Sequence, residues 1–461
     1  MGFSAQSQDS SRSQEYKWVP VDVLPVRDSI TIFATQQGTL ETLDKNGVKT
    51  GEGITLPDKP IGMGWLGDSF VVFYQKLKRY RTFELHAVTI DLIQRKIGED
   101  KLVQAVPAKY LSVAYLLRTP TGHLTGVLTR MTAYEIDGDP TYPDPGSDLA
   151  RRQYHTTSEA SLFTLNAGLQ LQPTPLAGNV LRNRFLGCQM NPQGTLFLET
   201  ADGSQVISEK ISPAGTVAQT LTYPYTLRKN EEIQVQAALD PFSENAVTLA
   251  TRYAVFRFDF SENKSRISPL DTLTWKWKAQ DAMQFLVPID IEETDDRIIL
   301  CQETQYLGPS VYYKKWAFHS GGVYWHHGTA VITVFDKQMA RRQCYVLGKS
   351  FQSAYQFDPA IAIHLVGERL YAATNEHDGE FVYSFDLHER FFERKKLRPA
   401  AVWKPGSLKP GFVVWSNNGL LVNYVFDHTI LSTNDRTVFI PAAFTDLEVM
   451  SPEVWTPMEW Q

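Results

Sequence analysis

Short apolar runs along this chain end repeatedly in a bulky apolar residue followed by Asp or Asn. The clear cases are Leu43-Asp44, Ile90-Asp91, Leu165-Asn166, Phe258-Asp259, Phe335-Asp336 and Phe385-Asp386, and Ile211-Ser212 and Thr433-Asn434 are weaker members. The steps between the polar members are 47, 75, 46, 47, 77, 50 and 48 residues. A recurring period of 46 to 50 residues in strand-like sequence predicts a β-propeller of four-stranded antiparallel blades.

A second series of turn residues tests the first. In each unit, polar or Gly residues precede the apolar run expected to be the second strand. These turns are Arg27-Asp28, Gly67-Asp68, Gly122, Gly194, Asn245, Asp295-Asp296, Gly367-Glu368 and Asn418-Gly419. Because the two series agree, we expect eight blades. Seven blades is the alternative, since the last anchor is the weakest and terminal repeats are often atypical.

The repeats predict a single all-β domain over residues 18–445. A flexible polar segment, 1–17, is expected before it and a tail, 446–461, after it. The tail has two Trp and four acidic residues, and it is expected either to lie across the blades or to serve as a docking peptide. Charged residues in 388–398 predict an outer strand whose charges protect a sheet edge.

The third and sixth units carry insertions. From the early turn to the Asp or Asn anchor they need 44 and 40 residues, whereas five of the other six units need 14 to 18. The extra residues, about 133–157 and 304–328, therefore lie between the second and third strands. Both insertions are expected to rise from one face of the ring, on roughly opposite sides of its central channel.

The insertion of the sixth unit is unusually aromatic, and aromatic side chains on an exposed loop are typical of interface anchors and sugar-stacking platforms. The binding residues predicted here are Tyr312, Tyr313, Trp316, His319, Tyr324, Trp325 and His326. The alternative is a hairpin that packs its own aromatic residues as a small core.

Loops on the same face add further candidates. Arg79 and Arg81 of the second unit are expected at a polar rim, and His377 and Asp378 of the seventh unit complete the predicted binding set. An enzyme would use His326 or His377 as its base together with Asp378 or Asp427. The sequence contains no HExxH, GxSxG, P-loop or CxxC motif, so no catalytic residues are assigned.

The third unit's insertion has four Asp residues that could supply oxygen ligands to Ca²⁺. Its prolines at 140, 143 and 145, and Tyr142 where an EF-hand loop needs Gly, favour a rigid solvated loop instead. Neither a metal nor a cofactor is predicted.

Composition argues against two classes of partner, nucleic acid and membrane. A net charge of −6 provides no basic field for nucleic acid, and no run reaches the length of a membrane span. Cys188, Cys301 and Cys344 are scattered and are expected to be buried, inert thiols. The first 16 residues lack the apolar region of a signal peptide, so the chain as written is expected in the cytoplasm, although an exported protein without its signal would look the same.

Over about residues 18–445 the chain resembles β-propellers in general. The Trp-Asp dipeptide of WD40 repeats is absent, the paired Gly of kelch repeats occurs once, at Gly321-Gly322, and nothing resembles the Asp-box of sialidases. The resemblance implies a fold only. We expect a soluble, non-catalytic scaffold that binds a protein or peptide, with a glycan as another possible ligand. The alternatives are a hydrolase or lyase acting on a saccharide or similar polar substrate, and a structural subunit of a larger assembly.

Overall fold

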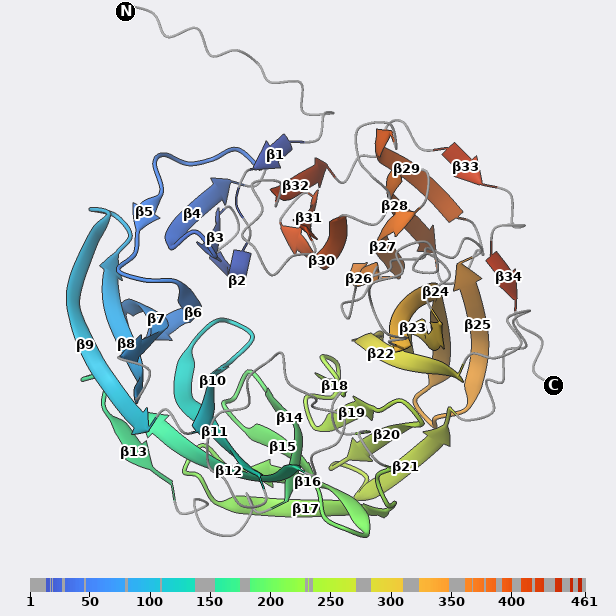
Figure 1. The fold of residues 1–461 in the computed structure, drawn as a ribbon, viewed down its shortest axis with the longest axis horizontal. Coiled ribbons are helices and arrows are strands. Elements are labelled where there is room, and N and C mark those ends of the chain that lie inside the picture. Colours follow the sequence, from blue (N-terminus) through green and yellow to red (C-terminus); the bar gives the residue numbers. More distant parts are fainter. Residues whose placement is uncertain are drawn as a thin grey trace, which may run out of the picture.

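The computed structural model is a ring of antiparallel β-sheets (Figure 1). It describes residues 14–457 except 17, 19, 27–29, 45–46, 79–81, 108–109, 137–153, 175–182, 229–230, 232–234, 271–282, 310–322, 348–360, 367, 377–378, 387–391, 400–407, 417–418, 427–435, 442–447 and 451–454. Among these residues, no helix has the length and apolar character needed to cross a bilayer.

The described strands form eight sheets, which we number along the chain. Sheet 1 contains β2 (Pro20–Val26), β3 (Ile30–Thr35), β4 (Thr39–Asp44) and β5 (Ile54–Thr55). Sheet 2 contains β6 (Pro60–Leu66), β7 (Ser69–Lys78), β8 (Thr82–Asp91) and β9 (Lys96–Pro107). Sheet 3 contains β10 (Tyr110–Arg118), β11 (Leu124–Ile136), β12 (Tyr154–Leu165) and β13 (Leu171–Pro173). Sheet 4 contains β14 (Arg184–Met190), β15 (Leu196–Ala201), β16 (Gln205–Ile211) and β17 (Val217–Pro224).

The second half of the ring uses segments from both chain ends. Sheet 5 contains β18 (Gln236–Leu239), β19 (Ala246–Ala250), β20 (Ala254–Asp259) and β21 (Lys264–Pro269). Sheet 6 contains β22 (Met283–Glu293), β23 (Arg297–Pro309), β24 (Val323–Asp336), β25 (Arg341–Leu347) and β34 (Trp455–Pro457). Sheet 7 contains β26 (Ile361–Val366), β27 (Arg369–Glu376), β28 (Gly379–Asp386), β29 (Phe392–Pro399) and β33 (Glu448–Met450). Sheet 8 contains β30 (Leu408–Ser416), β31 (Gly419–Phe426), β32 (Arg436–Pro441) and β1 (Gln14–Tyr16).

The prediction of a β-propeller with four-stranded antiparallel blades is confirmed. Successive strands pair within each sheet, and the hydrophobic core lies between neighbouring sheets. One cluster joins Phe197 of sheet 4 to Phe256 of sheet 5, and both side chains are fully buried. Stability in this arrangement comes mainly from contacts between neighbouring units, as in other repeat folds.

The Asp and Asn anchors have a common physical role. Five of these anchors lie at the end of the third strand of their sheets and accept backbone amide hydrogen bonds in the turn that follows. Asp44 accepts from Val48 at 2.8 Å, and Asn166 accepts from Gln170 at 2.9 Å. Asp91, Asp259 and Asp336 do the same in their own turns. These side chains satisfy amides that the strands leave unpaired, as in Asx turns.

Three predictions about the chain ends are corrected. Asn434 is not an anchor at the end of a third strand, because the third strand of sheet 8, β32, begins after it. The missing fourth strand comes from Gln14–Tyr16, which pairs with β32 and lies within the segment expected to be flexible. The outer strand β29 does not rely on its charges alone for protection, because β33 of the tail pairs with it. The tail crosses the outer edges of sheets 7 and 6.

Candidate functional site

The second strands of the sheets all end on one face of the ring, which we call the insertion face. Short turns join first to second strands on the opposite face, where Gly67, Gly122 and Gly194 have positive φ angles of 59°, 84° and 79°. Gly adopts this conformation without the penalty that a side chain brings. Because these turns set the start of the second strand, any extra strand length must project from the insertion face.

Sheets 3 and 6 project further than sheet 5. The β11–β12 hairpin has eleven paired positions and the β23–β24 hairpin has twelve, whereas β19–β20 has five. At roughly 3.3 Å per residue, the additional six or seven pairs correspond to about 20 Å of extra ribbon. The described part of the β11–β12 hairpin extends to the pair Ile136–Tyr154, and that of the β23–β24 hairpin extends to the pair Pro309–Val323.

The predicted aromatic site is only partly within the described residues. Tyr324, Trp325 and His326 lie in β24, where they pair with Gly308, Leu307 and Tyr306 of β23. The remaining predicted residues lie outside the described part of the chain, namely Arg79, Arg81, Tyr312, Tyr313, Trp316, His319, His377 and Asp378.

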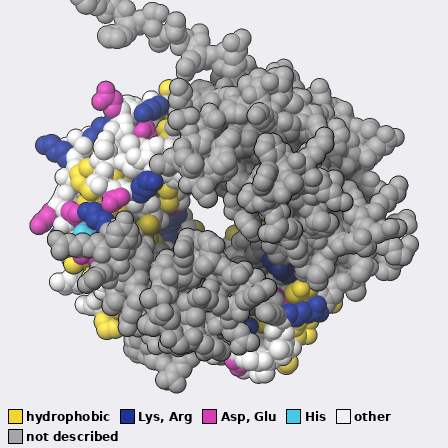
Figure 2. All heavy atoms as spheres, viewed as in Figure 1, with side chains coloured by type: hydrophobic (Ala, Val, Ile, Leu, Met, Phe, Trp, Pro, Cys, Tyr) yellow, Lys and Arg dark blue, Asp and Glu magenta, His cyan; other side chains and the backbone are white. Residues whose placement is uncertain are grey.

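Sheet 2 carries a charged group of side chains that the sequence analysis did not identify. His86 lies between two carboxylates, with its Nδ1 atom 2.8 Å from Asp100 and its Nε2 atom 3.1 Å from Glu84. The Lys76 amine lies 3.2 Å from the second oxygen of Asp100. The imidazole stacks on the buried Tyr74 ring, with centroids 5.4 Å apart. Figure 2 shows basic, acidic and His side chains close together over the left of the ring, where Figure 1 places sheet 2.

The contacts of His86 determine what this group can do. Its two ring nitrogens contact two different carboxylates, Asp100 and Glu84, which hold the ring in one orientation. Burial opposes ionisation of Asp100, but hydrogen bonds that include those from His86 and Lys76 hold its pKa below the usual range. Burial also raises the pKa of the Tyr74 phenol. The group therefore places one basic and two acidic side chains around a single imidazole on sheet 2.

A second group lies where sheet 4 connects to sheet 5 on the insertion face. The buried Glu231 carboxylate accepts hydrogen bonds from the Tyr225 hydroxyl at 3.0 Å, the Arg228 amide at 2.8 Å and the Thr251 hydroxyl. These bonds tie the connection to the β19–β20 turn. The exposed Arg228 guanidinium then lies over the Tyr253 ring, 4.2 Å from its centroid. Arg and Tyr are enriched among the residues that dominate protein interfaces, and here the pair is held in place before any partner binds.

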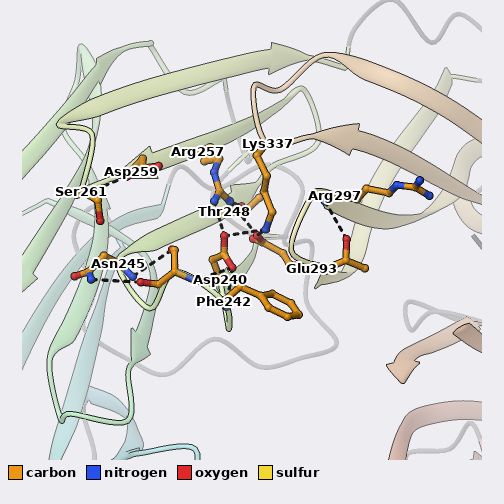
Figure 3. A network of polar contacts seen from close by, with 12 residues as sticks. Asp240, Phe242, Asn245, Thr248, Arg257, Asp259, Ser261, Glu293, Arg297 and Lys337 are labelled. Carbon is orange, nitrogen blue, oxygen red and sulfur yellow. Dashed lines mark hydrogen bonds and ion pairs between the residues drawn. The ribbon is translucent and has the colours of Figure 1, made fainter. Parts of the chain in front are cut away.

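On the opposite face, a buried ionic network joins sheets 5 and 6 (Figure 3). The Arg257 guanidinium binds Asp240 at 2.5 Å and Glu293 at 2.9 Å. The Lys337 amine binds the same two carboxylates at 2.8 and 2.6 Å. Burial raises the pKa of Glu293, whereas the hydrogen bonds from Lys337 and Arg257 lower the pKa of Asp240 despite its burial. Two cations and two anions balance within the protein, so the network holds two sheets together and is not a substrate site.

A third ionic contact joins the inner strands of sheets 1, 2 and 3. Both terminal nitrogens of Arg118 bind the two oxygens of Asp22, at 2.5 and 2.6 Å, and one of them also donates to the Met63 carbonyl at 2.8 Å. The Met63 amide in turn donates to Asp22 at 2.9 Å. Gly62 leaves room for the neighbouring Leu116 side chain, since a Cβ there would lie 2.7 Å from the Leu116 Cδ1 atom. The contact positions the inner strands of three sheets.

Within the described part of the chain, no group of three or more His, Cys, Asp and Glu side chains is arranged to hold a metal ion. The four Asp residues proposed for Ca²⁺ lie outside it. Cys188 and Cys301 are free thiols, and burial raises the pKa of Cys188 to about 12, so this thiol stays protonated at physiological pH.

The sequence matches no known protein family and no curated protein. Solved structures that superpose on the chain include BamB from Moraxella catarrhalis, at 12% identity and a TM-score of 0.45, covering 93% of this chain and 98% of that one. The Dos1 propeller superposes at 10% identity and a TM-score of 0.39, covering 91% of this chain and 76% of that one. Saccharomyces cerevisiae Sqt1 superposes at 8% identity and a TM-score of 0.35, covering 81% of this chain and 95% of that one. At these values the comparisons do not indicate an activity or a partner.

Proposed function

We propose that this chain is a non-catalytic binding protein that holds a protein or peptide partner on its insertion face. The observation that carries the proposal is the extra height of sheets 3 and 6. Their hairpins have eleven and twelve paired positions, against five in sheet 5. Two raised ribbons flanking lower sheets give a partner contacts on two sides, and ribbons held by ladders of paired residues lose little entropy on binding.

The lower stretch between the ribbons supports the same proposal. Sheets 4 and 5 lie between sheets 3 and 6 around the ring (Figure 1). Their insertion face carries the Arg228 and Tyr253 pair, which Glu231 holds in place. A partner lying against the aromatic segment of sheet 6 would therefore find a preformed cationic and aromatic contact beside it. We also infer that each of the eight sheets is one blade, with β1 as the fourth strand of the last.

The test removes the aromatic hairpin without disturbing its sheet. Because Leu307 and Trp325 are paired, residues 308–324 can be replaced by Asn-Gly, which favours a two-residue hairpin turn. Its matched control replaces 137–153 of sheet 3 in the same way, because Ile136 and Tyr154 are paired. Both variants are first compared with wild type by thermal unfolding.

Each protein is then used to capture partners from cells of its native host. We expect a specific partner on wild type that is lost with the shortened sheet 6 hairpin and retained, at least in part, with the shortened sheet 3 hairpin. A partner retained by both folded variants, or no specific partner on wild type, would contradict the proposal.

A further inference from the structure

The perimeter of this ring binds short extended segments from distant parts of the chain. In three sheets the outermost strand comes from a terminus. Strand β1 pairs with β32, β33 pairs with β29, and β34 pairs with β25, each through three residues in antiparallel register. Each strand forms its ladder with backbone groups, which any extended segment of suitable shape provides. Outer edges of this fold therefore accept an added strand.

The outer edge of sheet 4 has the properties of such a site and no described strand beside it. Strand β17 is eight residues long, Val217–Pro224, and contains no charged residue. The other described outer strands are short or charged: β5 and β13 have two and three residues, β21 contains Lys264 and Arg266, and β9 contains Lys96 and Lys101. Edge strands are normally protected from pairing by short length, charge, proline or covering elements. In β17 such protection comes from the terminal Pro224 and from a register shift between the pairs Lys210–Gln219 and Ile211–Val217, which leaves 219–222 as a regular, uncharged stretch of edge.

The register identifies which backbone groups of β17 point outward. The Tyr225 amide donates to the Ser204 carbonyl at 3.0 Å, so this position is a hydrogen-bonded pair. In an antiparallel ladder such pairs alternate with pairs whose amides and carbonyls point away. Thr222 and Thr220, paired with Ile207 and Glu209, therefore present their backbone groups to the outside. Both residues are exposed.

The strand is also held rigidly from its inner side. Leu221 is only 6% exposed and belongs to the core between sheets 4 and 5. The side-chain amide of Gln219 donates to the Phe260 carbonyl at 3.3 Å and to the Asn263 side-chain oxygen at 3.0 Å. The Ser265 hydroxyl donates to the Thr222 carbonyl at 2.7 Å, so that carbonyl is already engaged. The regular edge then presents the amide and carbonyl of Thr220 and the amide of Thr222. A rigid edge loses little conformational entropy when it binds an added strand.

We propose that the outer edge of β17 binds an extended, uncharged segment of a protein partner as a fifth antiparallel strand. The chain's own termini set the precedent for the occupant, since three-residue stretches such as Trp455–Pro457 bind corresponding outer strands in this way. The absence of charge along β17 favours an uncharged segment, because a charged one would be desolvated against the edge without an opposite charge in the strand. This site is separate from the insertion face.

The test uses Thr220→Pro. Proline removes the outward amide and blocks the edge, but it removes no ladder bond to β16, because that amide does not point to β16. Thr220→Val is the matched control, since it keeps the amide and the branched shape. Thr220→Lys is a second blocking variant that keeps the amide and adds charge, in case the proline variant unfolds. Wild type is used to select binders from a displayed library of random peptides, and the binders are measured against all variants.

We expect selected peptides that are uncharged, bind wild type and Thr220→Val equally, and bind the proline and lysine variants at least about tenfold more weakly. Their binding should slow amide exchange at Thr220 and Thr222, and it should persist when the sheet 6 hairpin is shortened, which separates this site from the proposed function. Failure to select peptides, or equal binding to the blocking variants, would overturn the proposal. So would a wild-type dimer that dissociates on Thr220→Pro, because the occupant would then be a second copy.

Discussion

The buried Glu199 carboxyl makes the stability of this protein depend on pH in a predictable way. Glu199 lies in β15 between sheets 4 and 5 with no exposed surface, and its only described side-chain hydrogen bond is a 3.1 Å bond from Ser208. Its second oxygen is buried without a hydrogen-bond partner among the described residues. Burial raises the pKa of this carboxyl from 4.5 to about 8. The folded protein therefore keeps a proton that the unfolded chain releases at much lower pH.

The sign and size of the effect follow from proton binding. Between the ordinary pKa of 4.5 and the folded pKa of about 8, the folded state binds more protons than the unfolded state, so the free energy of unfolding falls as pH rises. The change is about 1.4 kcal/mol per pH unit, so raising the pH from about 5 to 8 lowers the free energy of unfolding by roughly 3–4 kcal/mol. Glu199→Gln keeps the shape and a neutral amide, and it removes this loss.

The assay is thermal unfolding of wild type and Glu199→Gln at several pH values between about 5 and 8. A chain of 461 residues has an unfolding entropy near 1 kcal/mol/K, so the stability advantage of the variant should grow by about 3–4 °C in Tm across this range. Ser208→Ala is the control, because it removes only the hydrogen bond to Glu199 and should cost about 1 kcal/mol. An advantage of Glu199→Gln that stays constant with pH would show that Glu199 does not titrate there and would refute the reasoning.

Three further substitutions test contacts within and between sheets. Arg257→Ala should lower the free energy of unfolding by about 3–5 kcal/mol, because it leaves Asp240 and Glu293 with only the Lys337 amine between them. Chemical denaturation measures this change, and a loss below about 1 kcal/mol would contradict the prediction. Arg118→Ala should cost about 1–3 kcal/mol, with part restored by Arg118→Lys, which keeps the charge but not the two-point contact. Gly126→Ala should lower the Tm, because its Cβ would lie 2.2 Å from the Phe163 carbonyl oxygen, and an unchanged Tm would contradict that geometry.

The periodic features of the fold were predictable from the sequence because they are local. An anchor such as Asp44 or Asn166 caps the turn that follows it, so the same chemistry recurs at the same place in each unit. The sequence also contains a signal for bulges in the first strand of a sheet. The ladder shifts register directly after Pro20, Pro60 and Pro288. Proline is tolerated in strands mainly at such irregular positions.

The non-local features could not be predicted in this way. Nothing in the apolar pattern indicates that Gln14–Tyr16 completes the last sheet, because this pairing joins residues more than 400 positions apart. His86 and Asp100 lie in different strands, and the alternation of those strands does not specify which charges meet. Glu199 interrupts an apolar run, which suggests that its side chain is exposed. It is buried instead, because Gly187 on the neighbouring strand has no side chain and leaves space for it. Such placements depend on register and packing.

The placement of the core explains how this fold can vary its insertion face. The clusters that stabilise the ring join neighbouring sheets, as Phe70 and Ile32 do between sheets 2 and 1, and Phe335 and Val255 do between sheets 6 and 5. The β23–β24 ladder continues from Phe335 to Val323, well beyond these contacts. The hairpin ends can therefore change in length and composition without removing contacts on which the ring depends. Since the hairpins of sheets 3 and 6 are long while the anchors recur from sheet to sheet, we expect selection to act on the hairpins through binding and on the anchors and inter-sheet contacts through folding.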